Sequence, residues 1–336
     1  MNLSHRIELL VKLGQYITSN EKDWQKIKEK AFDANPWFLP EFIEQATKNI
    51  AETFLQEPVL KNWVAPYPQI GEGLHPPRLI GIVMAGNIPL VGFHDFLSVF
   101  ITGNKSRIKA SSKDEVLIHH LVEKLISWQP ELENWIQFGT LLKGCDAYIA
   151  TGSATTAEHF RYYFGKYPHL IRHNRTSVAI LDGNETPKEL EALADDVFLY
   201  FGMGCRNVTK LYVPNEYPFE PLIELFKKYN YFADLHKYKN NYDYNLALHV
   251  LNKQFYMSTG SLLLIEHPHI FSPVGQLHYE YYTNKDLLTT TLKAHPNIQC
   301  IVGKEFVPWG MAQCPAIDNY ADGENTLQFL VSLALT

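Results

Sequence analysis

From residue 79 onward, the sequence alternates apolar runs of strand length with segments of helical character. The first run, residues 79–85, is almost unbroken, as expected for a strand that is buried on both faces. Helices are expected at residues 89–101, 116–128, 154–164 and 189–200, and further strands at residues 106–109, 135–138, 147–150, 177–181, 210–213, 261–265 and 297–302. This alternation predicts an α/β protein with parallel sheets that are covered by helices.

The first 60 residues follow a helical rhythm instead. Apolar side chains recur every three or four positions, at Leu3, Ile7, Leu10 and Leu13. A second helix is predicted at residues 40–55, and Pro36 separates the two helices. Residues 66–77, with four prolines and two glycines, are expected to form an extended connection or hairpin. Residues 229–245 are rich in Tyr and Asn and are expected to be a surface excursion.

The composition excludes several classes of function. At 336 residues, the chain is long enough for about two domains. Its 30 basic and 36 acidic side chains give a net charge of −6, which argues against a general nucleic-acid-binding protein. The four cysteines are far apart and form no C-x-x-C pair, so neither a disulfide scaffold nor a cysteine zinc site is expected. The 14 histidines show no metal-ligand spacing, and no metal is expected.

The sequence also bears on where the protein would work. Residues 1–12 form a mixed amphipathic pattern rather than a signal peptide. The longest apolar stretch, residues 79–93, is interrupted by Asn87 and Pro89. It is shorter than the roughly 20 residues that a membrane-spanning helix needs. We therefore expect a soluble, cytoplasmic protein without a membrane span.

A Gly-Asn-Ile-Pro turn, residues 86–89, directly follows the first predicted strand. In open α/β sheets, ligands bind beyond the carboxyl ends of the strands. The side-chain amide of Asn87 could donate a hydrogen bond to a developing negative charge there. Gly, Asn and Pro are also common in ordinary turns, so a purely structural turn is the alternative.

A second candidate loop, Thr-Gly-Ser-Ala-Thr at residues 151–155, lies between a predicted strand and a predicted helix. Small residues let the backbone approach a ligand, and N–H groups at a helix N-terminus favour phosphate. Ser153 or Thr155 could equally cap the helix. Neither a G-x-G-x-x-G fingerprint nor a P-loop occurs in the sequence.

A third loop, Gly-Met-Gly-Cys-Arg-Asn at residues 202–207, carries a cysteine beside glycines. The glycines would leave the Cys205 sulfur accessible, and Arg206 with the local backbone N–H groups would favour its thiolate. The other cysteines are interpreted as small buried apolar residues, namely Cys145, Cys300 and Cys314.

The order and spacing of these motifs resemble the aldehyde dehydrogenase superfamily. The matching segments are residues 86–89, Gly103-Asn104, Lys109-Ala110-Ser111-Ser112, Thr151-Gly152-Ser153, Gly204-Cys205 and Ile-Phe-Ser-Pro-Val at residues 270–274. Two later segments, residues 308–315 and 318–323, resemble one branch in particular. This branch is the acyl-CoA reductases typified by the fatty acid reductase of bacterial bioluminescence, the LuxC type.

The resemblance implies an aldehyde dehydrogenase-like fold with two Rossmann-like parallel-sheet domains. Residues 1–182 would contain the N-terminal helices and the domain that binds a nicotinamide cofactor. Residues 183–312 would form the catalytic domain. Residues 313–336 would be a tail that packs back between the domains or on a partner subunit.

The resemblance also implies a role for individual residues. Cys205 would be the catalytic nucleophile that takes the acyl group as a thioester, and Asn87 would form the oxyanion hole with the Cys205 N–H. Residues at the adenosine ribose, pyrophosphate and nicotinamide of the cofactor would be Lys109, Ser112, Gly152 and Ser153.

The sequence departs from the superfamily pattern at three places. Ser112 and His269 stand where two ribose-binding glutamates are expected, and no carboxylate occurs beside Arg172 and His173, where a glutamate would activate water. A glutamate at position 112 would repel a 2′-phosphate. Because Ser112 is uncharged, and Lys105 or Lys113 could attract that phosphate, NADPH is expected in preference to NADH.

The implied reaction is the NADPH-dependent reduction of a fatty acyl thioester, on CoA or an acyl carrier, to the aldehyde through a Cys-bound acyl-enzyme. An acyl-transferring partner enzyme and a homo-oligomer are further expectations. Two alternatives stay open. One is a cysteine-dependent acyltransferase or thioesterase without nicotinamide, and the other is a non-catalytic subunit of an acyl-reduction complex.

Overall fold

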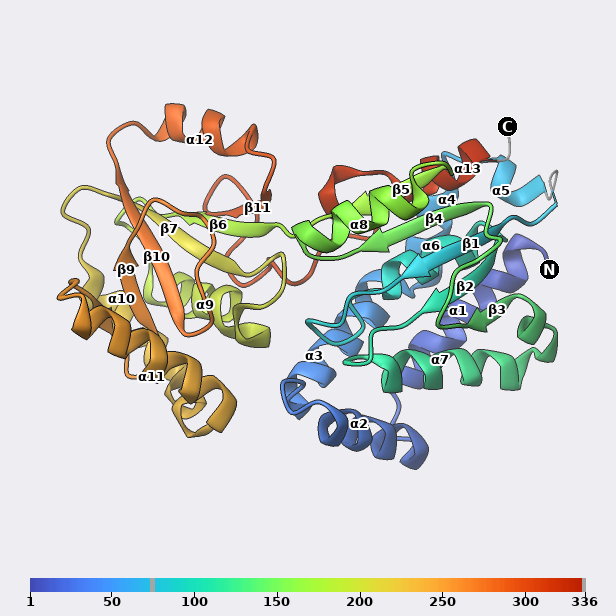
Figure 1. The fold of residues 1–336 in the computed structure, drawn as a ribbon, viewed down its shortest axis with the longest axis horizontal. Helices are drawn as coiled ribbons and strands as arrows, with labels where there is room; N and C mark the ends of the chain where they lie inside the picture. The colour runs from blue at the N-terminus through green and yellow to red at the C-terminus, as the bar shows by residue number, and fades with distance from the viewer. Residues whose placement is uncertain (73–75, 334–336) are drawn as a thin grey trace. The chain divides into compact units, whose positions relative to one another are not determined.

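The structure is a computed structural model that describes residues 1–72 and 76–333 (Figure 1). It divides the chain into two compact units. Unit 1 contains Met1–Asn174 and the C-terminal segment from Pro315, and unit 2 contains Arg175–Cys314. Each unit is built on one sheet, which confirms the α/β class predicted from the sequence. The division of labour between a cofactor domain and a catalytic domain stays a prediction.

Unit 1 has a five-stranded parallel sheet in the order β3-β2-β1-β4-β5. The strands are β1 (Leu79–Val83), β2 (Lys105–Lys109), β3 (Ile136–Phe138), β4 (Ala147–Thr151) and β5 (His169–Arg172). The chain builds outward from β1 to β3 and then crosses to the other side of β1. Ligands of doubly wound sheets bind at the carboxyl ends of the strands, where the winding reverses. In this sheet, the reversal lies between β1 and β4.

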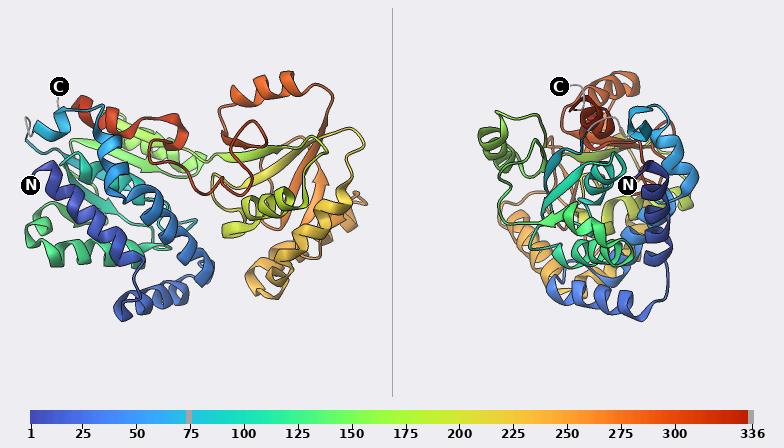
Figure 2. Two further views of the ribbon diagram at one scale, coloured as in Figure 1. Left: turned by 180° about the vertical axis from the view of Figure 1, so that it is seen from behind. Right: turned by 90° about the vertical axis from the view of Figure 1, so that its right-hand side faces the viewer.

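Helices cover both faces of this sheet. They are α1 (Leu3–Ile17), α2 (Lys22–Ala34), α3 (Pro40–Asn49), α4 (Glu57–Val64), α5 (Gln69–Glu72), α6 (Phe93–Ile101), α7 (Glu115–Trp128), α8 (Ala154–Phe164) and α13 (Thr326–Ser332). Crossovers between parallel strands are right-handed, so the reversal places α6 and α8 on opposite faces. Accordingly, α8 lies in front of the sheet in Figure 1, whereas α1 and α3 lie in front in the rear view of Figure 2.

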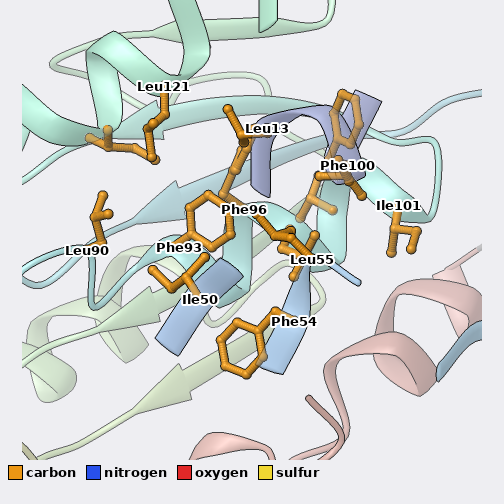
Figure 3. Packing of buried hydrophobic residues seen from close by; sticks show 14 of the residues in the cluster. Leu13, Ile50, Phe54, Leu55, Leu90, Phe93, Phe96, Phe100, Ile101 and Leu121 are labelled. Atoms are coloured by element: carbon orange, nitrogen blue, oxygen red, sulfur yellow. The ribbon is translucent and has the colours of Figure 1, made fainter. Parts of the chain in front are cut away.

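The core of unit 1 lies between the sheet and the N-terminal helices. Phe93, Phe96 and Phe100 of α6 are at most 5% exposed and gather with Leu13 of α1 and with Leu55 (Figure 3). Helix α6 also packs against α13, so the C-terminal segment completes this core. These side chains come from segments far apart in the sequence, so the N-terminal helices, the sheet and α13 share one hydrophobic core.

Unit 2 has a six-stranded sheet in the order β11-β6-β7-β10-β9-β8. The strands are β6 (Thr176–Ile180), β7 (Val208–Pro214), β8 (Met257–Ser258), β9 (Leu263–Glu266), β10 (Gln276–Tyr282) and β11 (Ile298–Val302). The pairs are parallel except for β8 with β9. The helices are α9 (Pro187–Phe198), α10 (Phe219–Phe226), α11 (His236–Leu251) and α12 (Lys285–Lys293). A capping box of Thr186 and Glu189 starts α9, as its sequence favours.

Several expectations from the sequence need correction. Residues 229–245 are not a surface excursion, because they form part of a 3₁₀ segment and of α11, and Phe232 and Tyr238 are buried there. The helix expected at residues 40–55 is α-helical only to Asn49 and continues as the π-helical turn Ile50–Phe54. Of the connection expected at residues 66–77, residues 73–75 lie outside the described residues, and Gln69–Glu72 form α5.

Within residues 1–72 and 76–333, no helix is long and apolar enough to cross a bilayer.

Candidate active site

The carboxyl ends of three adjacent strands bring most of the sequence-predicted site residues of unit 1 to one sheet edge. Val83 at the end of β1 is paired with Lys109 of β2 and with Ala150 of β4. The loops that follow these strands carry Asn87, Ser112 and Gly152-Ser153. They therefore emerge side by side, next to the reversal between β1 and β4.

The loop after β1 packs directly on the loop after β2. A Cβ atom at Gly86 would lie 2.4 Å from the Ser111 Oγ and 3.3 Å from the Asp114 Cβ, so this close approach requires glycine. The Leu90 N–H donates to the Asp114 Oδ2 at 2.7 Å, and Leu90 has a left-handed φ of 55°. Asp114 thus fixes the far end of the loop that carries Asn87.

Asp114 was not identified from the sequence. Its side chain is 7% exposed, and no described atom forms a hydrogen bond with its Oδ1. Burial raises the pKa of the carboxyl well above its ordinary value, more than the Leu90 N–H lowers it. An Asp before a predicted helix looks like an ordinary N-cap, yet Asp114 makes no side-chain cap bond to α7.

Ser153 is the N-cap of α8, as the structural alternative proposed. Its Oγ accepts a hydrogen bond from the Thr156 N–H at 3.3 Å and lies 2.8 Å from the Thr156 Oγ1. The Gly152 N–H donates to the Arg172 carbonyl at 3.3 Å, which ties this loop to the end of β5. Capping does not conflict with a cofactor-binding role, which stays a prediction for Gly152 and Ser153.

The fold supplies carboxylates where the local sequence has none. Arg172 at the end of β5 pairs with Asp95 at 2.5 Å and donates to the Thr326 Oγ1 at 2.7 Å. His173 follows, and its Nδ1 lies 3.9 Å from the Asp322 Oδ2. The absence of a carboxylate beside Arg172 and His173 therefore holds for the sequence but not for the folded unit. Residues about 150 positions away provide Asp322 and Thr326, and no local pattern predicts them.

In unit 2, Cys205 is half-buried in the loop between α9 and β7. Two bulky residues before it, Tyr200 and Phe201, have left-handed φ values of 55° and 56°, and Gly202 follows at 74°. This conformation costs roughly 1–2 kcal/mol for each residue other than glycine. After the loop, the Asn207 side chain is fully buried and hydrogen-bonded to backbone on both sides. No local sequence pattern predicts either feature.

The other three cysteines lie in different surroundings. Burial raises the pKa of the Cys145 thiol in unit 1 and of the Cys300 thiol in unit 2. The Cys300 Sγ lies 3.1 Å from the Ser177 Oγ, which donates to the Cys205 carbonyl at 3.1 Å. Cys314 is half-buried at the end of unit 2. Raised pKa values make Cys145 and Cys300 poor nucleophiles.

Two of the segments that carried the family resemblance are held in place within unit 2. The Thr209 Oγ1 donates to the Ile270 carbonyl at 2.6 Å, and the His278 Nδ1 lies 2.9 Å from the His269 carbonyl oxygen. Asp196 of α9 accepts hydrogen bonds from the N–H groups of Gly310 at 2.7 Å and Ala312 at 2.9 Å.

A family model for acyl-CoA reductase (LuxC) matches residues 44–221, more than half of the chain. The chain belongs to the LuxC acyl-CoA reductase family. The matched segment of this LuxC-family chain includes every residue proposed above for the site, from Asn87 to Cys205. None of the curated proteins matches its sequence.

Solved structures similar to this LuxC-family chain are aldehyde dehydrogenases. Aldehyde dehydrogenase 21 from Physcomitrella patens, in complex with the reaction product succinate, has a TM-score of 0.67 at 12% identity, covering 99% of this chain and 85% of its own. An NAD-dependent aldehyde dehydrogenase from Sinorhizobium meliloti has a TM-score of 0.63 at 11% identity, covering 90% and 70%. NADP-dependent glyceraldehyde-3-phosphate dehydrogenase from Bacillus halodurans, complexed with NADP, has a TM-score of 0.63 at 12% identity, covering 90% and 74%. The aldehyde dehydrogenase-like fold is confirmed.

Proposed function

We propose that the chain reduces a fatty acyl thioester to the aldehyde with NADPH, through an acyl group bound to Cys205. Family membership and fold support an oxidoreductase that acts on acyl or aldehyde groups. The observation that carries the finer proposal is Cys205 itself, a half-buried thiol in a loop whose backbone is hydrogen-bonded to the side chains of Ser177 and Asn207. Cys145 and Cys300 have pKa values raised by burial, which disfavours them as nucleophiles.

Features of unit 1 fit a nicotinamide dinucleotide. A Cβ atom at Gly152 would lie 2.9 Å from the Thr156 Cγ2, so glycine allows the backbone to lie close to the start of α8. The N–H groups in the first turn of α8 favour a phosphate. Lys109 is the last residue of the neighbouring strand β2, and Ser112 lies in the loop after it at the same sheet edge. Both would lie at the adenosine ribose.

In the proposed reaction, the Cys205 thiolate attacks the thioester carbonyl carbon and forms a new C–S bond. The carbonyl oxygen becomes an oxyanion, to which the Asn87 amide and the Cys205 N–H donate hydrogen bonds. The C–S bond to the carrier then breaks, and the carrier leaves as a thiolate that takes up a proton. When bound, the nicotinamide supplies the hydride that reduces the acyl group, after which the aldehyde leaves and Cys205 is regenerated.

The proposed preference for NADPH now rests on Lys113 rather than Lys105. Lys105 begins β2 at the amino-terminal edge of the sheet, and its Nζ lies 5.9 Å from the Trp135 ring centroid. It is therefore at the wrong end of β2 for a 2′-phosphate. Lys113 directly follows Ser112, in the loop at the carboxyl-terminal edge.

The test is to incubate the protein with an acyl-CoA in the absence of NADPH and to measure its intact mass. We expect one acyl adduct, which Cys205→Ala abolishes and the matched variant Cys314→Ala retains. Adding NADPH should clear the adduct and release aldehyde. An adduct on Cys205→Ala would show that the nucleophile is wrong, and the absence of any adduct on the wild-type protein would favour a non-catalytic subunit.

One contact favours a thioesterase as the second candidate. Asp322 lies 3.9 Å from His173, and a His with a carboxylate beside it can act as a general base toward water. A thioesterase would release free fatty acid without NADPH, and His173→Ala would slow that release. A long-lived adduct in buffer would exclude it. An acyl-transferring partner enzyme, a homo-oligomer and a cytoplasmic location stay predictions.

A further inference from the structure

The backbone of the segment just before Cys205 is strained. Tyr200, Phe201 and Gly202 are three consecutive left-handed residues, and the first two carry large aromatic side chains. Bulky residues adopt this conformation only where the surroundings impose it, and such strain clusters at functional sites. The turn ends three residues before Cys205.

Aromatic packing holds this turn in place. Tyr200 and Phe201 are only 3% and 4% exposed. The Phe201 ring centroid lies 4.7 Å from that of Phe232 and 5.3 Å from that of Tyr238, so the 3₁₀ segment and α11 clamp Phe201. The residues of the supposed surface excursion are therefore part of the support of the nucleophile loop.

The side chain of Asn207 closes the loop from the other end. Its Oδ1 accepts a hydrogen bond from the Gly204 N–H at 2.8 Å. Its Nδ2 donates to the carbonyls of Asp196 at 3.0 Å and Leu199 at 2.8 Å, at the end of α9. A side-chain amide is suited to this position because it combines an acceptor with two donors.

Two further hydrogen bonds, one from a backbone N–H and one from a side-chain hydroxyl, fix the peptide planes on both sides of the Cys205 Cα. The Asn207 N–H donates to the Gly204 carbonyl at 3.1 Å. Because the peptide is planar and trans, this bond also sets the direction of the Cys205 N–H. The Cys205 carbonyl accepts the hydrogen bond from Ser177. The loop thus holds the Cys205 N–H, and the Cα that carries the thiol, in a single orientation.

We propose that Asn207, together with the left-handed turn of Tyr200–Gly202, is a positioning device that orients Cys205 and its N–H for acyl transfer. This inference rests on the proposed function, in which Cys205 is the nucleophile and its N–H an oxyanion donor. Asn207 acts through the loop and does not itself touch the acyl group. A misplacement of about 1 Å at a reacting atom can cost about 10²-fold in rate.

The test compares Asn207→Ala with Asn245→Ala, a second buried asparagine of unit 2, whose Nδ2 donates to the Val274 carbonyl at 3.0 Å. Two rates are measured for each variant. One is acylation of Cys205 by an acyl-CoA in a single turnover, and the other is its alkylation by iodoacetamide, which needs no oxyanion hole. Peptide mapping assigns the modified cysteine in both cases.

For Asn207→Ala we expect the acylation rate to fall about 10²-fold, whereas the alkylation rate of Cys205 should change less than about threefold. For Asn245→Ala we expect both rates to stay close to those of the wild-type protein. A merely structural role would not separate the two rates, because unfolding would speed the alkylation of half-buried Cys300 as well. Wild-type acylation by Asn207→Ala, or an equal loss in both variants, would overturn the inference.

If Asn207→Ala does not fold, the variant Gly202→Ala tests the inference instead. A Cβ atom there would lie 3.5 Å from the nearest atom, the Val197 carbonyl oxygen, so this variant disturbs only the left-handed backbone. Slower acylation with unchanged alkylation supports the inference, and an unchanged acylation rate overturns it. If the proposed function itself is wrong, the result would differ, because the Cys205→Ala variant would still form an acyl adduct.

Discussion

At the scale of single residues, short polar side chains hold the candidate loops. Asp114 accepts the Leu90 N–H after the Asn87 turn, Asn207 bridges both ends of the Cys205 loop, and Asp196 accepts two N–H groups of the segment near Gly310. All three are buried, and each satisfies backbone groups that would otherwise lack partners. Fixed backbone is what a preorganised site needs, so these residues matter to chemistry that they do not perform.

The first prediction at this scale concerns Asn87. Asn87→Ala should lower turnover by roughly 10²–10³-fold, the usual effect of losing one oxyanion donor. The dissociation constant for NADPH should change little, because the lost hydrogen bond forms only as charge develops. Steady-state kinetics with fluorescence titration check both expectations. Near wild-type turnover would mean that residues 86–89 are an ordinary turn.

The second prediction concerns Ser112. Ser112→Glu places a carboxylate next to Lys113 at the sheet edge where the ribose is proposed to bind. Repulsion of a 2′-phosphate should then weaken NADPH much more than NADH, by about tenfold or more for one unfavourable charge contact. The measurement is the dissociation constant of each cofactor. The neighbouring variant Ser111→Glu is not a suitable control, because Ser111 packs on Gly86 and a larger side chain there would displace the loop. Equal weakening of the two cofactors would contradict the placement.

At the scale of elements, a buried ion pair ties together parts of unit 1 that are distant in sequence. Arg172 of β5 contacts Asp95 of α6 and Thr326 of α13, and the side chains of the ion pair are 4% and 7% exposed. One guanidinium therefore connects the sheet, a central helix and the C-terminal helix. The Arg172 Nε has no hydrogen-bond partner among the described residues. The ion pair with Asp95 is therefore the main interaction that offsets the cost of burying the guanidinium charge.

This arrangement predicts a large effect on stability. Asp95→Ala leaves a buried guanidinium uncompensated and should lower the free energy of unfolding by about 3–5 kcal/mol. The double variant Asp95→Leu with Arg172→Met should recover much of that loss. Glu57→Ala is the control, because the Lys61–Glu57 pair is more than half exposed and should contribute less than about 1 kcal/mol. Urea unfolding measures all three, and equal losses for Asp95→Ala and Glu57→Ala would contradict the reasoning.

How far the sequence predicts an element depends on how its side chains are distributed. Apolar β1 and β4 were predictable because both of their faces are buried. In contrast, β5 (His-Leu-Ile-Arg) and β10, which contains a His, a Glu and three tyrosines, were not predicted, since charged and aromatic side chains obscure the strand pattern. Helix α11 was missed for the same reason, because its buried residues include tyrosines and an asparagine.

At the scale of the whole molecule, the positions of the candidate loops were predictable from the sequence, but the distant residues that pack against these loops were not. The parallel direction of the strands follows from their alternation with helices, so the residues after strands could be assigned to one sheet edge from the sequence. Asp322 beside His173, or Tyr238 beside Phe201, are pairs that only the folded chain creates. Tertiary contacts of this kind leave no local pattern.

The acid stability of the folded chain gives the fourth prediction. Burial lowers the pKa of His278 to about 4 from an ordinary 6.5, and the pKa of neighbouring His267 is lowered by the same cause. An unfolded chain gains a proton near pH 6.5 that the folded chain does not, so stability should fall as the pH drops from 6.5 toward 4. Below pH 4 this contribution changes no further.

His278→Gln should remove part of that acid sensitivity, since glutamine can still donate to the His269 carbonyl and carries no titratable group. The exposed His159 provides the control variant His159→Gln. Urea midpoints measured between pH 7.5 and 4.5 check the expectation. A midpoint that falls as steeply for His278→Gln as for the wild-type protein would rule out His278 as the source.

The C-terminal return of the chain to unit 1 has a consequence for synthesis on the ribosome. Unit 2 is one continuous stretch and is fully translated by Cys314, whereas unit 1 still lacks the helix that covers α6 and supplies Thr326 to Arg172. Domains generally fold as units in the order in which they emerge. In this chain, unit 2 can complete its fold first, while the apolar surface of unit 1 that α13 covers is still exposed. The nascent chain therefore exposes this apolar surface to chaperones, and to aggregation, until the segment after Cys314 has emerged.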